Sequence, residues 1–140
     1  MTKINFGRVI LGGLVAGVFL ILGDFLMHTM SLGEQWKVAM AAQGVAEPGT
    51  STIVFFCILD LIIGIAIVWL YAAIRPRFGA GARTAIASGI VAWFFGWFWQ
   101  MSGLLAMGMY PKELILMTLA WGFFQIPIAA FLGAWLYKEA

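Results

Sequence analysis

Five strongly polar side chains lie inside long apolar stretches of this sequence, and they are the residues most able to do chemistry. They are Asp24, His28, Asp60, Gln100 and Gln125. Within a membrane such residues usually face other helices or a cavity, because a buried carboxylate costs about 2.5–3.5 kcal/mol on insertion scales. Two carboxyl groups in one layer of low dielectric cannot both ionise cheaply, so one is expected to keep its proton. The set predicts either a structural hydrogen-bonded layer or a proton or ion site.

A metal site is a third interpretation of the same residues. Asp24 and His28 are four residues apart, so they meet on one face of a helix. With Asp60 they could supply three ligands, because imidazole and carboxylate groups suit zinc, manganese or iron. The single histidine and single cysteine exclude sites that need two imidazoles or several thiolates from one chain. An Asp–His pair whose two side chains bond only to each other is the simpler interpretation. We therefore expect neither a metal nor a cofactor.

The composition indicates that these residues belong to a membrane protein. Hydrophobic residues make up 64% of the 140-residue chain and charged residues only 10%, whereas an average soluble domain has about 45–50% and about 25%. The net charge of +2 is too small for an electrostatic footprint on nucleic acid. The composition therefore excludes an ordinary soluble enzyme, a disordered chain and a nucleic-acid binder, and it predicts a protein in contact with the lipid bilayer.

Four stretches reach the roughly 20 apolar residues that a transmembrane helix needs. They are 7–30, 52–74, 83–109 and 113–137. We expect an all-α, integral membrane bundle of four transmembrane helices, formed as one membrane domain over 1–140. Between the first two, Ser31 and Glu34 form a capping-box pattern. It predicts a short helix over 32–43 in the outer interface, anchored by Trp36; the alternative is a structured loop.

The basic residues predict the orientation of the bundle. Lys37 and Lys112 fall on one side of a four-pass topology. Six basic residues fall on the other side: Lys3, Arg8, Arg75, Arg77, Arg83 and Lys138. Because cytoplasmic loops carry the excess of Lys and Arg, both termini are expected in the cytoplasm.

Helical periodicity predicts which residues face one another. Gly13 and Gly17 form a G-x-x-x-G pair, a pattern that lets membrane helices approach closely. Eleven residues make almost three turns, so Asp24 shares a face with Gly13, and His28 with Gly17. Each other polar residue also falls on a stripe of small residues in its helix. We therefore expect a polar layer between the helices, with Asp24 and Asp60 within a few ångströms of the same depth.

Aromatic residues near mid-membrane form a separate candidate site. Trp93, Trp97 and Trp121 lie too deep to belong to an interfacial belt. Ordinary packing is the first interpretation. A pocket for a flat apolar ligand or a cation is the alternative, because tryptophan faces attract cations.

The two halves of the chain also share a pattern. The tripeptide Trp-Leu-Tyr ends both the second and the fourth stretch, at 69–71 and 135–137. Both halves would start in the cytoplasm, so a duplication would give a 2+2 parallel repeat about an axis along the membrane normal. Coincidence between interfacial aromatic residues is the alternative.

Three segments carry a resemblance to a group of small, uncharacterised bacterial four-helix inner-membrane proteins. They are 4–10 (INFGRVI), 69–79 (WLYAAIRPRFG) and 133–139 (GAWLYKE). The resemblance extends over essentially the whole chain and implies the fold and a multi-pass location in the bacterial inner (plasma) membrane, without any activity to transfer. Small multidrug-resistance exporters are similar in size and also have a membrane acid in the first helix. This chain differs in its late first acid, its long first loop and its second acid.

The usual enzymatic constellations are absent from the sequence. It has no nucleophile–base pair, phosphate loop or dinucleotide fingerprint. We therefore expect a small non-enzymatic inner-membrane protein, acting as a homo-oligomer or as an accessory subunit of a membrane complex. The alternative is a proton-linked small transporter, or an ion- or apolar-ligand-binding protein, that uses Asp24 and Asp60.

Overall fold

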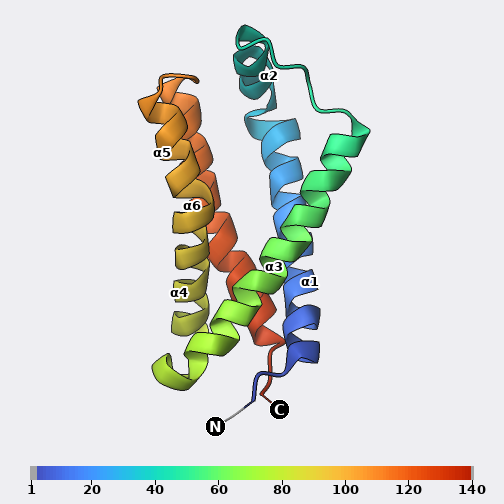
Figure 1. Ribbon diagram of the computed structural model, residues 1–140, viewed down its shortest axis with the longest axis vertical. Helices are drawn as coiled ribbons and strands as arrows, with labels where there is room; N and C mark the ends of the chain where they lie inside the picture. Colours follow the sequence, from blue (N-terminus) through green and yellow to red (C-terminus); the bar gives the residue numbers. More distant parts are fainter. Residues whose placement is uncertain (1–2, 140) are drawn as a thin grey trace.

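The computed structural model describes residues 3–139, and these residues form helices without any strand (Figure 1). Four helical spans are long and apolar enough to cross a membrane. In chain order the elements are α1 (Phe6–Leu26), the π-helical turn η1 (Met27–Ser31), α2 (Gly33–Ala42), α3 (Thr50–Phe78), α4 (Ala82–Trp93), the π-helical turn η2 (Phe94–Phe98), α5 (Trp99–Ala106) and α6 (Lys112–Trp135). The expected all-α class with four candidate transmembrane helices is confirmed.

Local sequence signals explain where several helices begin and end. Asn5 caps α1, because its side-chain oxygen accepts a hydrogen bond of 3.1 Å from the backbone N–H of Arg8. Helix α3 continues past Pro76, which removes only one hydrogen bond in the last turn. It stops at Gly79, whose φ of 87° suits glycine. The second span is therefore longer than the 52–74 expected from hydropathy.

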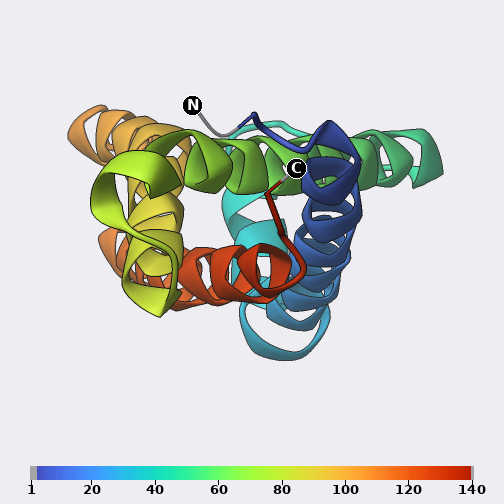
Figure 2. The ribbon, with the colours of Figure 1, turned by 90° about the horizontal axis from the view of Figure 1, so that it is seen from below.

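The helices pack as two antiparallel pairs. Helix α1 packs along α3, α4 packs along α6, and α1 also contacts α6. Helix α3 crosses α1 obliquely, and both termini lie at the same end of the bundle as the turn between α3 and α4 (Figure 1). Viewed toward that end, α3 and α6 lie on opposite sides, with α4 and α1 between them at the flanks (Figure 2).

Glycines bring the backbones of α1 and α3 together. A Cβ atom added to Gly17 would lie 2.6 Å from the Cα of Leu61 and 2.9 Å from the carbonyl oxygen of Asp60. A Cβ on Gly13 would overlap the backbone of Ile65, and a Cβ on Gly64 would overlap the carbonyl of Gly13. Both residues of the G-x-x-x-G pair thus lie against the α3 backbone, and this contact places Asp60 in the α1–α3 interface.

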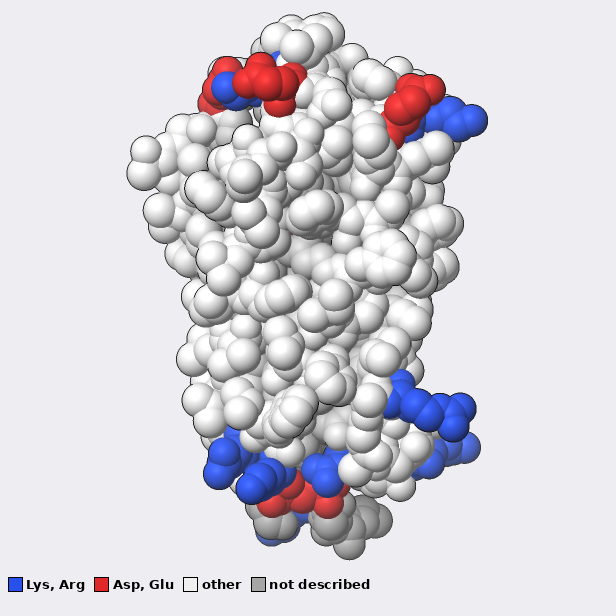
Figure 3. Space-filling model, turned by 180° about the vertical axis from the view of Figure 1, so that it is seen from behind, with Lys and Arg blue, Asp and Glu red and all other residues white. Residues whose placement is uncertain are grey.

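The surface between the two ends of the bundle is apolar. Many large side chains point outward, for example Phe25, Phe56 and Trp135, which are 62%, 56% and 74% exposed. On the face shown in Figure 3, charged residues gather at the two ends and a broad band between them has none. Such a band matches the apolar interior of a bilayer. The four spans are therefore compatible with a small integral membrane protein.

Candidate functional site

The centre of the candidate site is the side-chain amide of Gln125. Gln125 lies on α6 and is 8% exposed. Its Nε2 donates one hydrogen bond of 2.9 Å to Oδ1 of Asp24 and another of 2.8 Å to the backbone oxygen of Leu20, both on α1. The amide therefore joins the first and fourth spans through a residue pair that the sequence had placed in one layer.

A glycine makes room for this amide. A Cβ on Gly23 would lie 2.5 Å from Nε2 of Gln125 and 2.6 Å from its Cδ. These distances are far below ordinary van der Waals contact, so any larger residue at position 23 would displace the Gln125 side chain. The sequence signal for this residue is a glycine next to an intramembrane acid.

Asp60 is the most deeply buried acid among the described residues. It is 7% exposed, and its carboxyl group makes no hydrogen bond to another described residue. Side chains on a helix lean toward its N-terminus. Because α3 and α1 are antiparallel, the carboxyls of Asp60 and Asp24 lean toward one another.

The backbones of Asp60 and Asp24 nevertheless lie at different positions along the axis of α1. The backbone of Asp60 packs against Gly17. Asp24 is seven residues farther along α1, which corresponds to about 10 Å at a rise of 1.5 Å per residue. The oblique crossing of α3 over α1 (Figure 1) sets the position of Asp60 along α1, and the lean of the two side chains shortens the distance between the two carboxyl groups.

His28 lies at the outer edge of the site. It is exposed, and its Nδ1 donates to the backbone oxygen of Asp24 at 2.9 Å, not to the carboxylate. The residue belongs to the π-helical turn η1, in which the N–H of Leu32 donates to the oxygen of Met27. Among residues 3–139, no three His, Cys, Asp or Glu side chains gather in a way that could hold a metal ion. The three-ligand arrangement considered from the sequence is therefore not formed.

Gln100 does not join the other polar residues. It is exposed, and it makes no hydrogen bond to another residue in the described part of the chain. The reason is the π-helical turn η2, in which the N–H of Trp99 donates to the oxygen of Phe94. Such a turn accommodates about one extra residue, which rotates the rest of the helix by about 100°. The stripe expected from regular periodicity therefore changes direction after Trp93, where η2 begins.

The three mid-membrane tryptophans divide between two environments. Trp93 donates from Nε1 to the backbone oxygen of Leu119 at 3.1 Å, and Trp93 and Trp97 both pack over Gly122. Trp121 has a buried Nε1 without a hydrogen-bond partner among the described residues. Trp93 and Trp97 pack against the main buried cluster of the bundle. Trp121 packs instead against the smaller cluster of Met27, Leu32, Ala39 and Leu114. Two hollows, of about 450 Å³ between α4 and α6 and about 750 Å³ between α2 and the start of α6, are lined by other residues.

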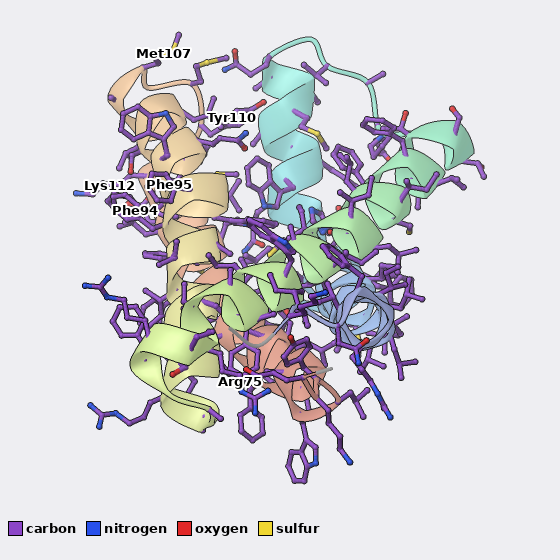
Figure 4. The ribbon with its side chains drawn as sticks, turned by 60° about the horizontal axis from the view of Figure 1, so that its bottom comes forward. Arg75, Phe94, Phe95, Met107, Tyr110 and Lys112 are labelled. Atoms are coloured by element: carbon purple, nitrogen blue, oxygen red, sulfur yellow. The ribbon has the colours of Figure 1, made fainter. Side chains whose placement is uncertain are left out.

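Helix α2 is held against the bundle by contacts that the sequence did not indicate. Trp36 donates from Nε1 to Oγ1 of Thr118 on α6 at 3.3 Å, and its ring meets Tyr110 edge-on at 5.2 Å. Tyr110 points toward α2 from the connection between α5 and α6 (Figure 4). Gln43 donates from Nε2 to the oxygen of Met109 at 2.7 Å. Trp36 was interpreted as a lipid anchor, because nothing local to it identifies a partner on a distant helix.

Two tyrosines join neighbouring segments at the end of the bundle that carries the termini. The hydroxyl of Tyr71 accepts a bond of 3.2 Å from the N–H of Gly81, and that of Tyr137 accepts one of 3.3 Å from the N–H of Asn5. Their rings meet edge-on at 5.9 Å. The guanidinium of Arg75 (Figure 4) lies 5.5 Å from the Tyr137 ring centre. The repeated Trp-Leu-Tyr tripeptide was the sequence signal for this pair.

The chemistry available to the buried set is hydrogen bonding and proton exchange. It comprises two carboxyl groups and one amide, drawn from α1, α3 and α6. No protein-family model, curated protein or solved structure matches the chain.

Proposed function

We propose that this chain is a small non-enzymatic integral protein of the bacterial inner membrane that acts as an accessory or oligomeric subunit. The observation that carries the proposal is the use of the Gln125 amide: both of its N–H groups are bonded within the chain, to Asp24 and to Leu20. An interhelical tie of this kind stabilises membrane helices by about 0.6–2 kcal/mol per bond. It is sufficient to explain why Gln125 and Asp24 lie inside the bundle without any reaction.

The orientation belongs to the same proposal. Arg75 and Arg77 lie in the last turn of α3, at the end of the bundle that also carries both termini. The excess of basic residues at that end supports a cytoplasmic location for it, with α2 in the outer interface. A tag at either terminus is expected to be cytoplasmic and a tag at Glu47 periplasmic. Protease access to the Glu47 tag only from the cytoplasmic side would contradict the orientation.

A 2+2 parallel repeat is also part of the proposal. Tyr71, in the last third of the second span, bonds the backbone that precedes the third, and Tyr137, just after the fourth span, bonds the backbone that precedes the first. The pairing of α1 with α3 likewise corresponds to the pairing of α4 with α6. These equivalent contacts support a pseudo-two-fold axis along the membrane normal.

A proton-linked carrier or ion-binding protein is the second candidate, and one observation favours it. Asp60 is 7% exposed and has no hydrogen-bond partner among the described residues. Intramembrane acids are rare and often mark proton or ion pathways. An acid that merely tied helices together would be expected to have such a partner, as Asp24 has in Gln125.

Asp60→Asn separates the two candidates. The amide keeps the size and hydrogen-bonding capacity of Asp60 but cannot exchange a proton. The purified protein would be placed in vesicles that contain a pH-sensitive dye, and proton uptake would be driven by a potassium diffusion potential. For a structural subunit, parent and variant vesicles should leak protons equally, and the variant should be at least as stable, because a neutral amide is easier to bury.

For a proton-linked protein, the parent should take up protons faster than empty vesicles, and Asp60→Asn should lose that uptake while remaining folded. Glu34→Gln is the matched control, because Glu34 is an exposed acid at the outer end of the bundle. Uptake above the level of empty vesicles that only Asp60→Asn abolishes would overturn the structural proposal.

A further inference from the structure

The third span combines two properties that conflict for a membrane helix. Among the four spans it has the lowest mean hydropathy, yet only 6% of its most apolar window is buried, against 44% for the fourth span. Its outer half, formed by η2 and α5, contains no buried residue. In a bilayer, the least apolar helix is expected to have the most protein around it. The outer half of the third span therefore lacks a covering that its composition requires.

Gln100 is the residue at which the missing covering of the third span is most costly. Its exposed amide lies on α5, six residues before the helix ends at Ala106, or about 9 Å along the helix axis. Exposure in a membrane means contact with lipid, which offers no hydrogen bonds to an amide. Because no described residue bonds Gln100, its donors and acceptor remain open in a medium that cannot satisfy them.

The glycines beside Gln100 also differ from the other glycines of the spans. A Cβ on Gly96 or Gly103 would meet nothing within 4 Å, whereas a Cβ on Gly17 would strike backbone. Gly103 follows Gln100 by three residues within the regular helix α5, so the two share a face. Gly96 precedes Gln100 by four residues from within η2, and the wider π-helical turn keeps it on the same side, because one such turn takes more than the 3.6 residues of an α-helix. Glycines on such a face allow another helix to approach closely enough for an interhelical hydrogen bond.

We propose that this face, defined by Gly96, Gln100 and Gly103, joins two copies of the chain side by side in the membrane, with the two Gln100 amides bonded across a two-fold axis. A second copy fits because an amide carries both a donor and an acceptor and is therefore complementary to itself. Two copies with the same orientation also place Gln100 at the same depth, as a two-fold interface requires. The proposal rests on the oligomeric role given above and names the surface that serves it.

Cysteine cross-linking tests the position of the interface. In a Cys57→Ser background, Gly103→Cys would be oxidised in native membranes and the products separated without reductant. The expected result is a covalent dimer, because a two-fold contact brings the two positions within disulfide reach. Phe55→Cys is the matched control, on the outer half of α3 with 57% exposure, and it should remain monomeric. Dimers from Phe55→Cys but not from Gly103→Cys would overturn this interface while leaving an oligomeric role intact.

Energy transfer between labelled copies at increasing protein-to-lipid ratio tests the amide itself. Gln100→Leu should require at least about a threefold higher protein density for half-maximal transfer, since it loses the interhelical bond. Gln100→Asn should remain close to the parent, and Met101→Leu controls for an apolar change at the next position. Equal midpoints for Gln100→Leu and the parent, or a monomeric parent at every density, would overturn the proposal.

Discussion

Gly17→Ala is a direct test of how the first two spans pack. The added methyl group would lie 2.6 Å from the Cα of Leu61 and 2.9 Å from the oxygen of Asp60. Both obstructing atoms belong to the α3 backbone, so no side chain can rotate to make room. Ordinary contact begins near 3.4 Å, which leaves a shortfall of about 0.8 Å that the two helices must absorb by moving apart.

The magnitude follows from two opposing effects. Overpacking of a close contact costs about 1–3 kcal/mol, whereas replacing glycine by alanine within a helix gains up to about 1 kcal/mol. Gly7→Ala is the matched control, because a Cβ there would lie at an ordinary 3.6 Å from the side-chain oxygen of Asn5, which caps the same helix. We expect Gly17→Ala to be less stable than Gly7→Ala by about 1–3 kcal/mol, which isolates the clash from helix propensity.

The assay is reversible unfolding in mixed micelles at increasing denaturing detergent. The fluorescence of the seven tryptophans reports the transition, and circular dichroism checks that both variants start with the same helix content. If Gly17→Ala is as stable as Gly7→Ala, then α1 and α3 do not meet through this glycine contact, and the position of Asp60 that depends on it is wrong.

Three further predictions concern the polar contacts. Gly23→Ala should lower the free energy of unfolding by about 1–2 kcal/mol, because it displaces the amide of Gln125 from its partners on α1. In a Gln125→Ala background the same change should cost nothing, and an equal cost in both backgrounds would disprove the steric argument. Trp36→Phe removes the N–H that bonds α6 and should speed hydrogen exchange throughout α2, whereas Val38→Ala, at a 69% exposed position, should not; unchanged exchange in both would contradict this docking. Tyr137→Phe should destabilise by about 0.6–1 kcal/mol in the same unfolding assay, because the backbone before α1 loses its partner; a neutral effect would mean that the bond is not formed.

The helices were the most predictable part of the molecule. Stretches of roughly 20 apolar residues can satisfy their backbone groups in a membrane only as helices, so their number follows from hydropathy alone. Residues that begin or end a helix were also informative: Asn5 caps the start of α1, and Gly79 ends α3. The close approach at Gly13 and Gly17 follows from a four-residue spacing in a helix that remains regular through both positions.

The candidate site was less predictable, because it depends on how helices cross and rotate. Gln125 could be placed on an inner stripe, but its bond to Asp24 required the meeting of α1 and α6 and the space left by Gly23. The level of Asp60 required the oblique path of α3. The outward position of Gln100 required a π-helical turn, and nothing in the aromatic run 94–98 marks where such a turn forms.

By itself, the sequence determined that the chain forms four apolar helices with polar residues inside them, because hydropathy and helical periodicity act over a few neighbouring residues. The tertiary structure decided which polar groups meet. Gln125 bonds Asp24, Asp60 has no hydrogen-bond partner within residues 3–139, and Gln100 is exposed. These outcomes depend on the crossing of α3 over α1 and on the extra residue in η2, which rotates the rest of the third span by about 100°. Both features are set by packing between segments far apart in the chain.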